Sequence, residues 1–361
     1  MVERIDVGIL GATGVVGQHF VSLLAEHPWF RLTWIAASDR SAGRRYAEIP
    51  WRIVPPRPTF ADDLVISRVE PDAAPSLVFS ALDAAVAGEA ETAFARAGRL
   101  VISNARNHRM DPLVPLLIPE VNPDHLKLLS QQRHAYEWDG GIITNPNCST
   151  VFLTMALAAL RPFRPQRVLV TTLQALSGAG YPGVPALDAV GNVIPFIAGE
   201  EQKMETEPLK LLGTLTEDGI ENAGIIISAQ ATRVPVADGH TVAMSVLLGQ
   251  DAAVQEIRAA FESWTGVPQQ LGLPTAPARP LVYVDADDRP QPKLDVMRDG
   301  GMAVTIGRLR RCPLFTCKFV VLGHNTIRGA AGAALLNAEL AHATGALKRD
   351  VVQRKQSKLS V

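Results

Sequence analysis

The sequence predicts an α/β protein in which a parallel sheet with crossover helices precedes a second domain of α+β type. Through residue 144, short apolar runs alternate with helical segments, a pattern typical of a parallel sheet. After about residue 160 the strands become longer and no longer alternate with helices. A length of 361 residues with 47% hydrophobic content also suggests two domains.

Composition excludes several classes of protein. The net charge of -1 argues against a partner made of nucleic acid. No apolar run approaches the roughly 20 residues that cross a membrane, and residues 1–6 carry charges where a signal peptide is apolar. Three cysteines form no disulfide framework, which favours the reducing cytoplasm. Cys312 and Cys317 lack further ligands for a metal, so we interpret them as packing residues.

The first strand, over residues 5–11, leads directly into a glycine-rich turn and a helix from about Val15 to Glu26. Its glycines are spaced three apart, at Gly8, Gly11, Gly14 and Gly17. Glycines let a backbone approach a pyrophosphate, and the helix N-terminus supplies N–H donors. The context predicts a Rossmann-type dinucleotide-binding domain, the alternative being merely a tight turn.

The second strand, residues 32–37, ends where a dinucleotide enzyme contacts the adenosine ribose. Asp39 could accept from a 2′-hydroxyl, but basic and hydroxyl side chains that suit a 2′-phosphate outnumber it. They are Arg40, Ser41, Arg44 and Arg45. We therefore predict NADP rather than NAD, with a solvated charged loop as the alternative.

Two further strands, residues 77–80 and 100–103, flank a helix predicted from Asp83 to Ala97. The carboxyl ends of parallel strands line the ligand crevice, which places Ser80, Ala81 and the 104–109 loop there. That loop could bind an anion through its arginines, or be solvated.

A turn at residues 144–150 separates a short strand from a strongly apolar helix and places Cys148 in the first turn of that helix. Free backbone N–H groups and the helix dipole favour a thiolate there. The alternative is a small buried hydrophobe, the common fate of a free Cys.

The second half begins with a strand over residues 167–174 that ends in a Gly-rich loop, and Gln174 is unusually polar for that position. Residues 199–205 open an acidic-basic helix, a pattern that is usually solvated. Residues 224–236 and 241–248 predict an antiparallel hairpin with Arg233 and His240 beside its turn.

The last part predicts a helix over residues 254–264, a Pro-rich connection over 274–292 and strands around 302–311 and 315–323. An Ala-rich helix from Asn325 to Thr344 has little side-chain bulk and is expected to return to the first domain. Residues 348–361 form a polar tail that we expect to fray.

Several motifs together closely resemble the aspartate-β-semialdehyde dehydrogenase family, in its archaeal and fungal-like branch. They cover nearly the whole chain and are highly specific in combination. The matching stretches are residues 11–17, 38–43, 145–150, Gln174, 177–180, 199–204, 233–240 and 324–332.

The resemblance implies a role for each candidate residue. Cys148 would be the nucleophile and His240 its acid/base, while Gln174 orients the carbonyl and Asn147 helps to stabilise the oxyanion. Arg233 would bind the substrate carboxylate, Glu200 the ammonium group, and Lys203 with Arg109 the phosphate. Between the neighbouring arginines, Arg106 stays an alternative to Arg109. The cofactor site would comprise Gly11, Ala12, Thr13, Gly14, Val15, Val16, Gly17, Ser38, Arg40, Ser41, Ser80, Ala81, Ser177, Gly178, Ala179, Gly180, Asn325 and Thr326.

The implied activity is the reversible, NADP-dependent reductive dephosphorylation of β-aspartyl phosphate to aspartate semialdehyde and phosphate. It serves the biosynthesis of lysine and diaminopimelate, threonine, methionine and isoleucine. The implied architecture is an NADP-binding domain of residues 1–147 and 325–361 and a catalytic and dimerisation domain of residues 148–324. A homo-oligomer is expected, either a dimer or a dimer of dimers.

Two other functions fit parts of the pattern. A paralogous malonyl-CoA reductase would keep the Cys, His and nucleotide motifs, but Glu200, Lys203 and Arg233 argue against it. A non-catalytic NADP-sensing protein is less favoured, because both Cys148 and His240 are present.

Overall fold

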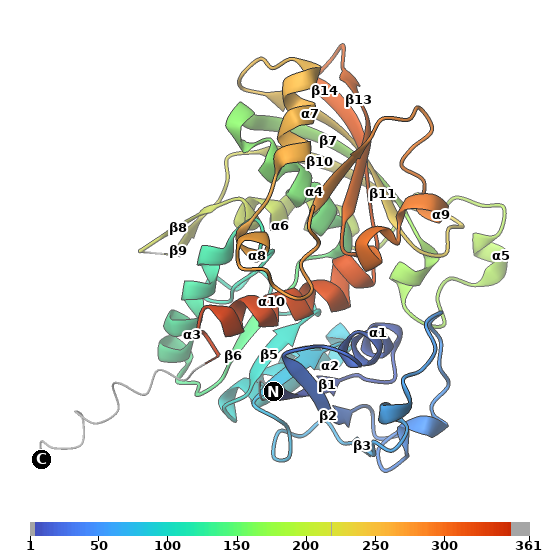
Figure 1. Cartoon of the computed structure of the whole chain (residues 1–361), viewed down its shortest axis with the longest axis vertical. Coiled ribbons are helices and arrows are strands. Elements are labelled where there is room, and N and C mark those ends of the chain that lie inside the picture. The colour runs from blue at the N-terminus through green and yellow to red at the C-terminus, as the bar shows by residue number, and fades with distance from the viewer. Residues whose placement is uncertain (1–3, 218, 348–361) are drawn as a thin grey trace, which may run out of the picture.

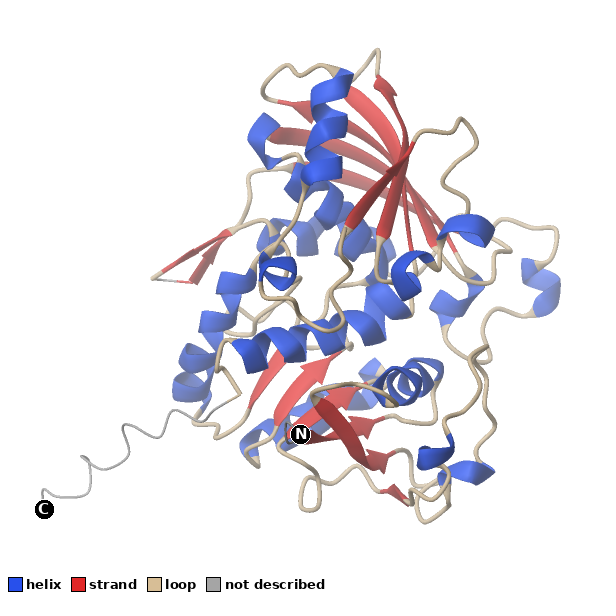
Figure 2. Ribbon diagram, in the orientation of Figure 1, coloured by secondary structure: helices blue, strands red, loops and turns tan. Residues whose placement is uncertain are grey.

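Two six-stranded sheets with their helices form most of the described chain, and β8 (Thr214–Thr216) and β9 (Gly219–Glu221) pair in a small separate sheet (Figure 1; Figure 2). The computed structural model describes residues 4–217 and 219–347. The polar tail predicted to fray lies outside the described residues. None of the helices in the described part of the chain is both long and apolar enough to cross a membrane.

The first sheet is entirely parallel and has the strand order β3-β2-β1-β4-β5-β6. The chain starts in its middle and later crosses to the other side of β1, so the strand order reverses there. This arrangement confirms the predicted α/β class. The strands are β1 (Ile5–Leu10), β2 (Phe30–Ala36), β3 (Ile66–Ser67), β4 (Leu77–Ser80), β5 (Leu100–Ser103) and β6 (Gly141–Thr144).

Helices cover both faces of this sheet, which explains why β4, β5 and β6 are buried at every position rather than alternating. On one face Phe94 packs with Val78 and Val101, and on the other Leu336 shares a core with Phe79 and Ile102. The helices are α1 (Val15–Leu24), α2 (Ala84–Arg96), α3 (Leu128–Tyr136) and α10 (Gly332–Ala343), the last preceded by a π-helix at Ile327–Ala331. The Ala-rich helix α10 contacts β5, so it does return to the first sheet (Figure 1).

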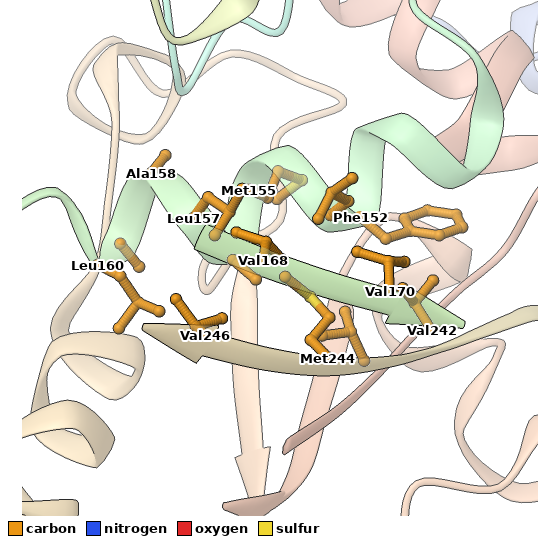
Figure 3. Close-up of a cluster of buried hydrophobic side chains, with 14 of the residues drawn as sticks. Phe152, Met155, Leu157, Ala158, Leu160, Val168, Val170, Val242, Met244 and Val246 are labelled. Carbon is orange, nitrogen blue, oxygen red and sulfur yellow. The ribbon is translucent and has the colours of Figure 1, made fainter. Parts of the chain in front are cut away.

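The second sheet is mixed and has the order β10-β7-β11-β14-β13-β12. Its strands are β7 (Pro165–Gln174), β10 (Ile226–Arg233), β11 (His240–Leu248), β12 (Leu281–Val284), β13 (Val304–Arg311) and β14 (Cys317–Gly323). One face packs on α4 (Cys148–Ala159), α6 (Glu200–Leu211) and α7 (Val254–Ser263). Figure 3 shows Phe152 and Met155 of α4 against Val170 of β7 and Val242 of β11. The helix that begins at Cys148 is therefore anchored in the core of the second half.

The predicted hairpin between residues 224–236 and 241–248 is wrong. β7 lies between β10 and β11, pairing parallel with the first and antiparallel with the second. The connection passes over the end of β7, where the Val234 N–H donates to the carbonyl of Gln174 and the Leu176 N–H to that of Val236. These hydrogen bonds satisfy backbone groups that a hairpin turn would have paired locally.

Short elements complete the chain. The Pro-rich connection predicted over residues 274–292 contains the unpredicted strand β12, which pairs parallel with β13. The remaining strands and helices are β8 (Thr214–Thr216), β9 (Gly219–Glu221), α5 (Ala186–Ala189), α8 (Val267–Gln270) and α9 (Pro292–Asp295), with 3₁₀ turns at Tyr46–Glu48, Thr59–Ala61, Pro123–Lys127, Arg161–Phe163, Leu176–Ala179 and Arg298–Gly301.

Candidate active site

The turn between β1 and α1 brings backbone close to backbone in a way that only glycine permits. Gly11 has a φ of +78°, and a Cβ atom on it would lie 2.5 Å from the carbonyl oxygen of Ala81. A Cβ on Gly17 would lie 2.3 Å from the oxygen of Gly11. The start of α1 thus presents bare backbone beside the carboxyl ends of β1 and β4, a cradle that fits a pyrophosphate.

Two adjoining cavities open beside this turn. The larger has a volume of about 450 Å³ and runs from Gly14 to Cys148. The smaller has a volume of about 290 Å³ and includes Ser41, Arg44 and Arg52. Gly14, Val15 and Tyr181 line both cavities. One elongated groove therefore joins the glycine turn to the cysteine turn.

The groove includes most of the predicted cofactor residues but not all of them. Those that line it are Thr13, Gly14, Val15, Val16, Ser41, Ala81, Ser177, Gly178, Gly180, Asn325 and Thr326. Gly11 and Ala12 lie in the supporting turn, Gly17 in helix α1 and Ser80 at the end of β4, whereas Ser38, Arg40 and Ala179 are not among the lining residues.

Arg52 is a groove residue that the sequence analysis missed. Its guanidinium carbon lies 3.4 Å from the centroid of the Tyr181 ring, a cation–π contact between the segment after β2 and the Gly-rich loop after β7. Its position in an irregular, Pro-rich segment carried no signal in the sequence.

Cys148 is the first residue of α4, as predicted. The Asn147 side chain caps this helix by accepting hydrogen bonds from the backbone N–H groups of Ser149 and Thr150, at 3.0 and 3.3 Å. Gly329 of the π-helix packs against the cysteine, since a Cβ there would lie 2.6 Å from the Cys148 Cβ. Helix α4 and the π-helix thus hold the thiol between them at the floor of the groove.

The electrostatic environment of Cys148 differs from the sequence expectation of a favoured thiolate. Burial raises the pKa of the Cys148 thiol to about 12, and the Glu200 carboxylate adds to the increase. The positive charges of Arg109 and Lys203 and the Ser149 N–H oppose this effect without overcoming it. At this thiol the effect of desolvation on the pKa thus outweighs that of the helix N-terminus.

Three of the predicted residues meet at the ends of adjacent strands. Arg233, the last residue of β10, is the register partner of Gln174, the last residue of β7. His240 opens β11 on the other side of β7. The strand order that replaced the predicted hairpin is thus what brings these side chains together.

Gly178 connects this group to the groove. A Cβ on Gly178, which lines the larger cavity, would lie 2.8 Å from Cε1 of His240 and 2.9 Å from Nη1 of Arg233. The Arg233 guanidinium donates to the carbonyl of Ala175 at 2.7 Å. Burial, followed by the positive charge of Arg233, lowers the pKa of His240 to about 3, so its imidazole is neutral at pH 7.

Helix α6 contributes Glu200 and Lys203, which the resemblance implied although such a charged run is usually solvated. Glu200 is buried and accepts from Nζ of Lys203 at 2.8 Å, from Nδ2 of Asn147 at 2.9 Å and from Nε2 of Gln174 at 3.2 Å. Burial acts to raise the pKa of Glu200, but the Lys203 charge and these hydrogen bonds lower it overall. Glu201 instead accepts from the Ala231 N–H of β10.

Arg109 and Arg106 have different environments. Arg109 is buried and lines the larger cavity, whereas Arg106 is exposed and is not among the lining residues. The Arg109 guanidinium donates to the carbonyl of Asn104 at 2.8 Å and to the carboxylate of Glu207 at 2.9 Å. Glu207 was missed because a Glu in a charged helix is usually exposed.

The other two cysteines lie away from the groove. Cys317 is fully buried in the core of the second sheet, and Cys312 is partly exposed. Within residues 4–217 and 219–347, no group of three or more His, Cys, Asp or Glu side chains could hold a metal ion.

Comparisons with known proteins agree with this geometry. Residues 6–129 match the family described as semialdehyde dehydrogenase, NAD binding domain, and residues 157–328 match semialdehyde dehydrogenase, dimerisation domain. The aspartate-semialdehyde dehydrogenase of Archaeoglobus fulgidus is 50% identical over 93% of this chain and 98% of its own. That of Cryptococcus neoformans is 47% identical over 96% and 99% of the two chains.

A solved structure is similar as well. The crystal structure of aspartate semialdehyde dehydrogenase with NADP from Candida albicans has a TM-score of 0.88 and 38% identity. The match covers 95% of this chain and 99% of that one. These matches confirm the resemblance that the sequence motifs indicated.

Proposed function

The chain belongs to the aspartate-semialdehyde dehydrogenase family, and on this premise we propose that it reductively dephosphorylates β-aspartyl phosphate with NADPH. The reaction is reversible and yields aspartate semialdehyde and phosphate for amino-acid biosynthesis. The observation that carries this proposal is that Cys148 and Arg109 line the groove that begins at the glycine turn, with Glu200 close enough to act on the pKa of the thiol.

Cys148 forms the covalent intermediate in this proposal. Its sulfur attacks the acyl carbon of β-aspartyl phosphate, the thiol proton passes to His240, and the carbon–oxygen bond to phosphate breaks. Phosphate leaves with the electron pair, and Arg109 and Lys203 hold it. Both cations lie close enough to Cys148 to act on the pKa of its thiol, which supports their place at the leaving group.

The glycine turn and groove fit NADP(H), with Ser41 and Arg44 of the smaller cavity available for a 2′-phosphate. When bound, this cofactor supplies the hydride that reduces the thioester. Asn147 and backbone N–H groups at the start of α4 stabilise the developing oxyanion. His240 then returns a proton to the sulfur as the carbon–sulfur bond breaks and aspartate semialdehyde leaves.

Three side chains recognise the rest of the substrate. Arg233 binds the α-carboxylate through its planar fork, and Glu200 receives the ammonium group. Gln174 orients the reacting carbonyl of the substrate. It is the register partner of Arg233, and its amide nitrogen lies 3.2 Å from the carboxylate of Glu200. Glu200 and Arg233 are both buried. Their charges favour a substrate that carries an ammonium group and a carboxylate over an acyl-CoA.

We further propose a division into an NADP-binding domain of residues 1–147 and 325–361 and a catalytic domain of residues 148–324. A second copy of the chain would cover the face of the second sheet opposite α4, where Leu169, Leu173 and Ile226 are exposed. A dimer, or a dimer of dimers, follows from this. Three free cysteines support a cytoplasmic location.

The proposal is tested by measuring NADPH formation from aspartate semialdehyde and NADP⁺ with and without phosphate. Phosphate-dependent turnover is expected, and Cys148→Ala should abolish it while Cys312→Ser leaves it unchanged. Turnover of malonyl-CoA with NADPH in its place would identify the paralogous reductase. NADP binding without any turnover would indicate a non-catalytic sensor.

A further inference from the structure

Helix α6 carries four charged residues on one face, of which the proposed mechanism uses only the first two. Glu200, Lys203, Glu207 and Lys210 recur at helical spacing. Glu207 is 2% exposed and Lys210 is 4% exposed. Buried charges are costly in free energy unless they are paired. The partners of Glu207 and Lys210 therefore indicate the role of each side chain.

The Glu207 carboxylate joins two parts of the site. Its Oε1 accepts from Nη1 of Arg109 at 2.9 Å, and its Oε2 accepts from the backbone N–H of Asn147 at 2.6 Å. Asn147 directly precedes the nucleophile Cys148. One carboxylate thus links the proposed phosphate-binding arginine to the turn that holds the thiol.

Lys210, one turn further along α6, fixes the backbone of the same arginine. Its Nζ donates to the carbonyl oxygens of Arg109, Asp111 and Val114 at 2.8, 2.7 and 2.8 Å. Lys210 therefore anchors the loop after β5, while Glu207 holds the guanidinium that this loop carries. The Nε of Arg109 has no partner among the described residues.

We propose that Glu207 is a positioning residue that sets the place of the Arg109 guanidinium relative to the Cys148 sulfur. The inference rests on the proposed function, in which Arg109 holds the phosphate. With one N–H directed to Glu207 and another to the Asn104 carbonyl, the guanidinium has a single orientation, and phosphate meets it in line with the thiol.

Both oxygens of Glu207 are needed for this task. In Glu207→Gln one of the two positions becomes an amide NH₂ group that faces either the Arg109 guanidinium or the Asn147 N–H, which are themselves donors. Glu207→Asp keeps the charge but is one methylene shorter and cannot span both partners. Neither variant removes the positive charge of Arg109, which then lacks a well-placed carboxylate and still attracts phosphate.

The expected signature is a loss of kcat without a rise in the KM for phosphate. In the phosphate-dependent oxidation of aspartate semialdehyde, Glu207→Gln and Glu207→Asp should lower kcat roughly 10- to 100-fold, as misplacement by about 1 Å does. Arg109→Ala should instead raise the KM for phosphate. The matched control is Glu205→Gln on the same helix, which keeps its acceptor for the Ala229 N–H and should behave as wild type.

A second measurement does not depend on turnover. Inorganic phosphate should protect Cys148 from alkylation by iodoacetamide. Peptide mass spectrometry measures the alkylated fraction of Cys148. The half-protecting concentration should rise in Arg109→Ala and should not rise in either Glu207 variant. If wild type fails to turn over aspartate semialdehyde, the proposed function fails, and the inference that rests on it fails with it. Wild-type kcat in both Glu207 variants, or protection weakened as much as in Arg109→Ala, would overturn the inference.

Discussion

The imidazole Nδ1 of His240 accepts a hydrogen bond from the backbone N–H of Ala175, with 3.0 Å between the two nitrogens. Because the amide is the donor, Nδ1 carries no proton and the neutral ring holds its proton on Nε2. That Nε2 has no partner among the described residues. Nε2 is therefore free to donate a hydrogen bond to a group bound beside it.

This tautomer predicts an order of activity among His240 variants. Gln places an N–H near the position of Nε2, whereas Asn reaches only as far as Nδ1. We expect His240→Gln to retain more activity than His240→Asn or His240→Ala, within the roughly 10²- to 10⁴-fold that a general acid contributes. Steady-state kcat for semialdehyde oxidation measures this, and equal losses in Gln and Asn would contradict it.

Glu200 should make the Cys148 thiol less reactive. Its negative charge is the second cause, after burial, of the raised pKa of Cys148. Glu200→Gln should lower that pKa and speed alkylation of Cys148 by iodoacetamide at pH 8, roughly tenfold for each pKa unit. Lys203→Met should slow it. The control is Glu201→Gln, whose carboxylate bonds Ala231; unchanged or slower alkylation in Glu200→Gln would argue against this account.

The contact between Gly329 and Cys148 predicts a loss of activity when a single methyl group is added. The Cβ of Gly329→Ala would lie 2.6 Å from the Cys148 Cβ and 3.1 Å from its Cα, so the nucleophile must shift. We expect kcat to fall by about 10²-fold for a shift near 1 Å. Gly224→Ala, whose Cβ has no neighbour within 4 Å, is the control. Full activity in Gly329→Ala would show that the contact is unimportant.

Acid should destabilise the fold through His19. Burial, followed by the charge of His324, lowers the pKa of His19 from 6.5 to about 4. Below pH 6.5 the unfolded chain binds a proton at His19, whereas the folded chain does not bind it until the pH is near 4. The free energy of unfolding therefore falls as the pH is lowered from 6.5 to about 4. Between pH 7.5 and pH 5, the free energy of unfolding should fall by about 2 kcal/mol less in His19→Gln than in wild type. Urea unfolding at the two pH values measures this difference. His134 is exposed, and in the control His134→Gln the free energy of unfolding should fall as much as in wild type.

The first half of the fold followed closely from local sequence patterns. Strands at residues 77–80 and 100–103 coincide with β4 and β5, and the helix after the glycine turn begins at Val15 as expected. Buried parallel strands and a glycine turn leave short, continuous signals because both faces of the sheet are apolar.

The second sheet was less accessible to prediction. Strands β10 and β11 were predicted, but their pairing was not, because β7 lies between them. Two strands show the same alternating pattern whether they pair directly or lie on either side of another strand. β12 was hidden in a Pro-rich segment because a four-residue edge strand carries little signal.

The sequence by itself determined the α/β class, the glycine turn, Cys148 at the start of its helix and the family, because these depend on residue types at short spacing. Only the tertiary structure decided that Glu207 bridges Arg109 and Asn147. It also decided that burial and Glu200 raise the pKa of Cys148 and that Nδ1 of His240 accepts from the Ala175 N–H. Desolvation and hydrogen-bond direction depend on what surrounds a group in space, and those neighbours come from segments far apart in the chain.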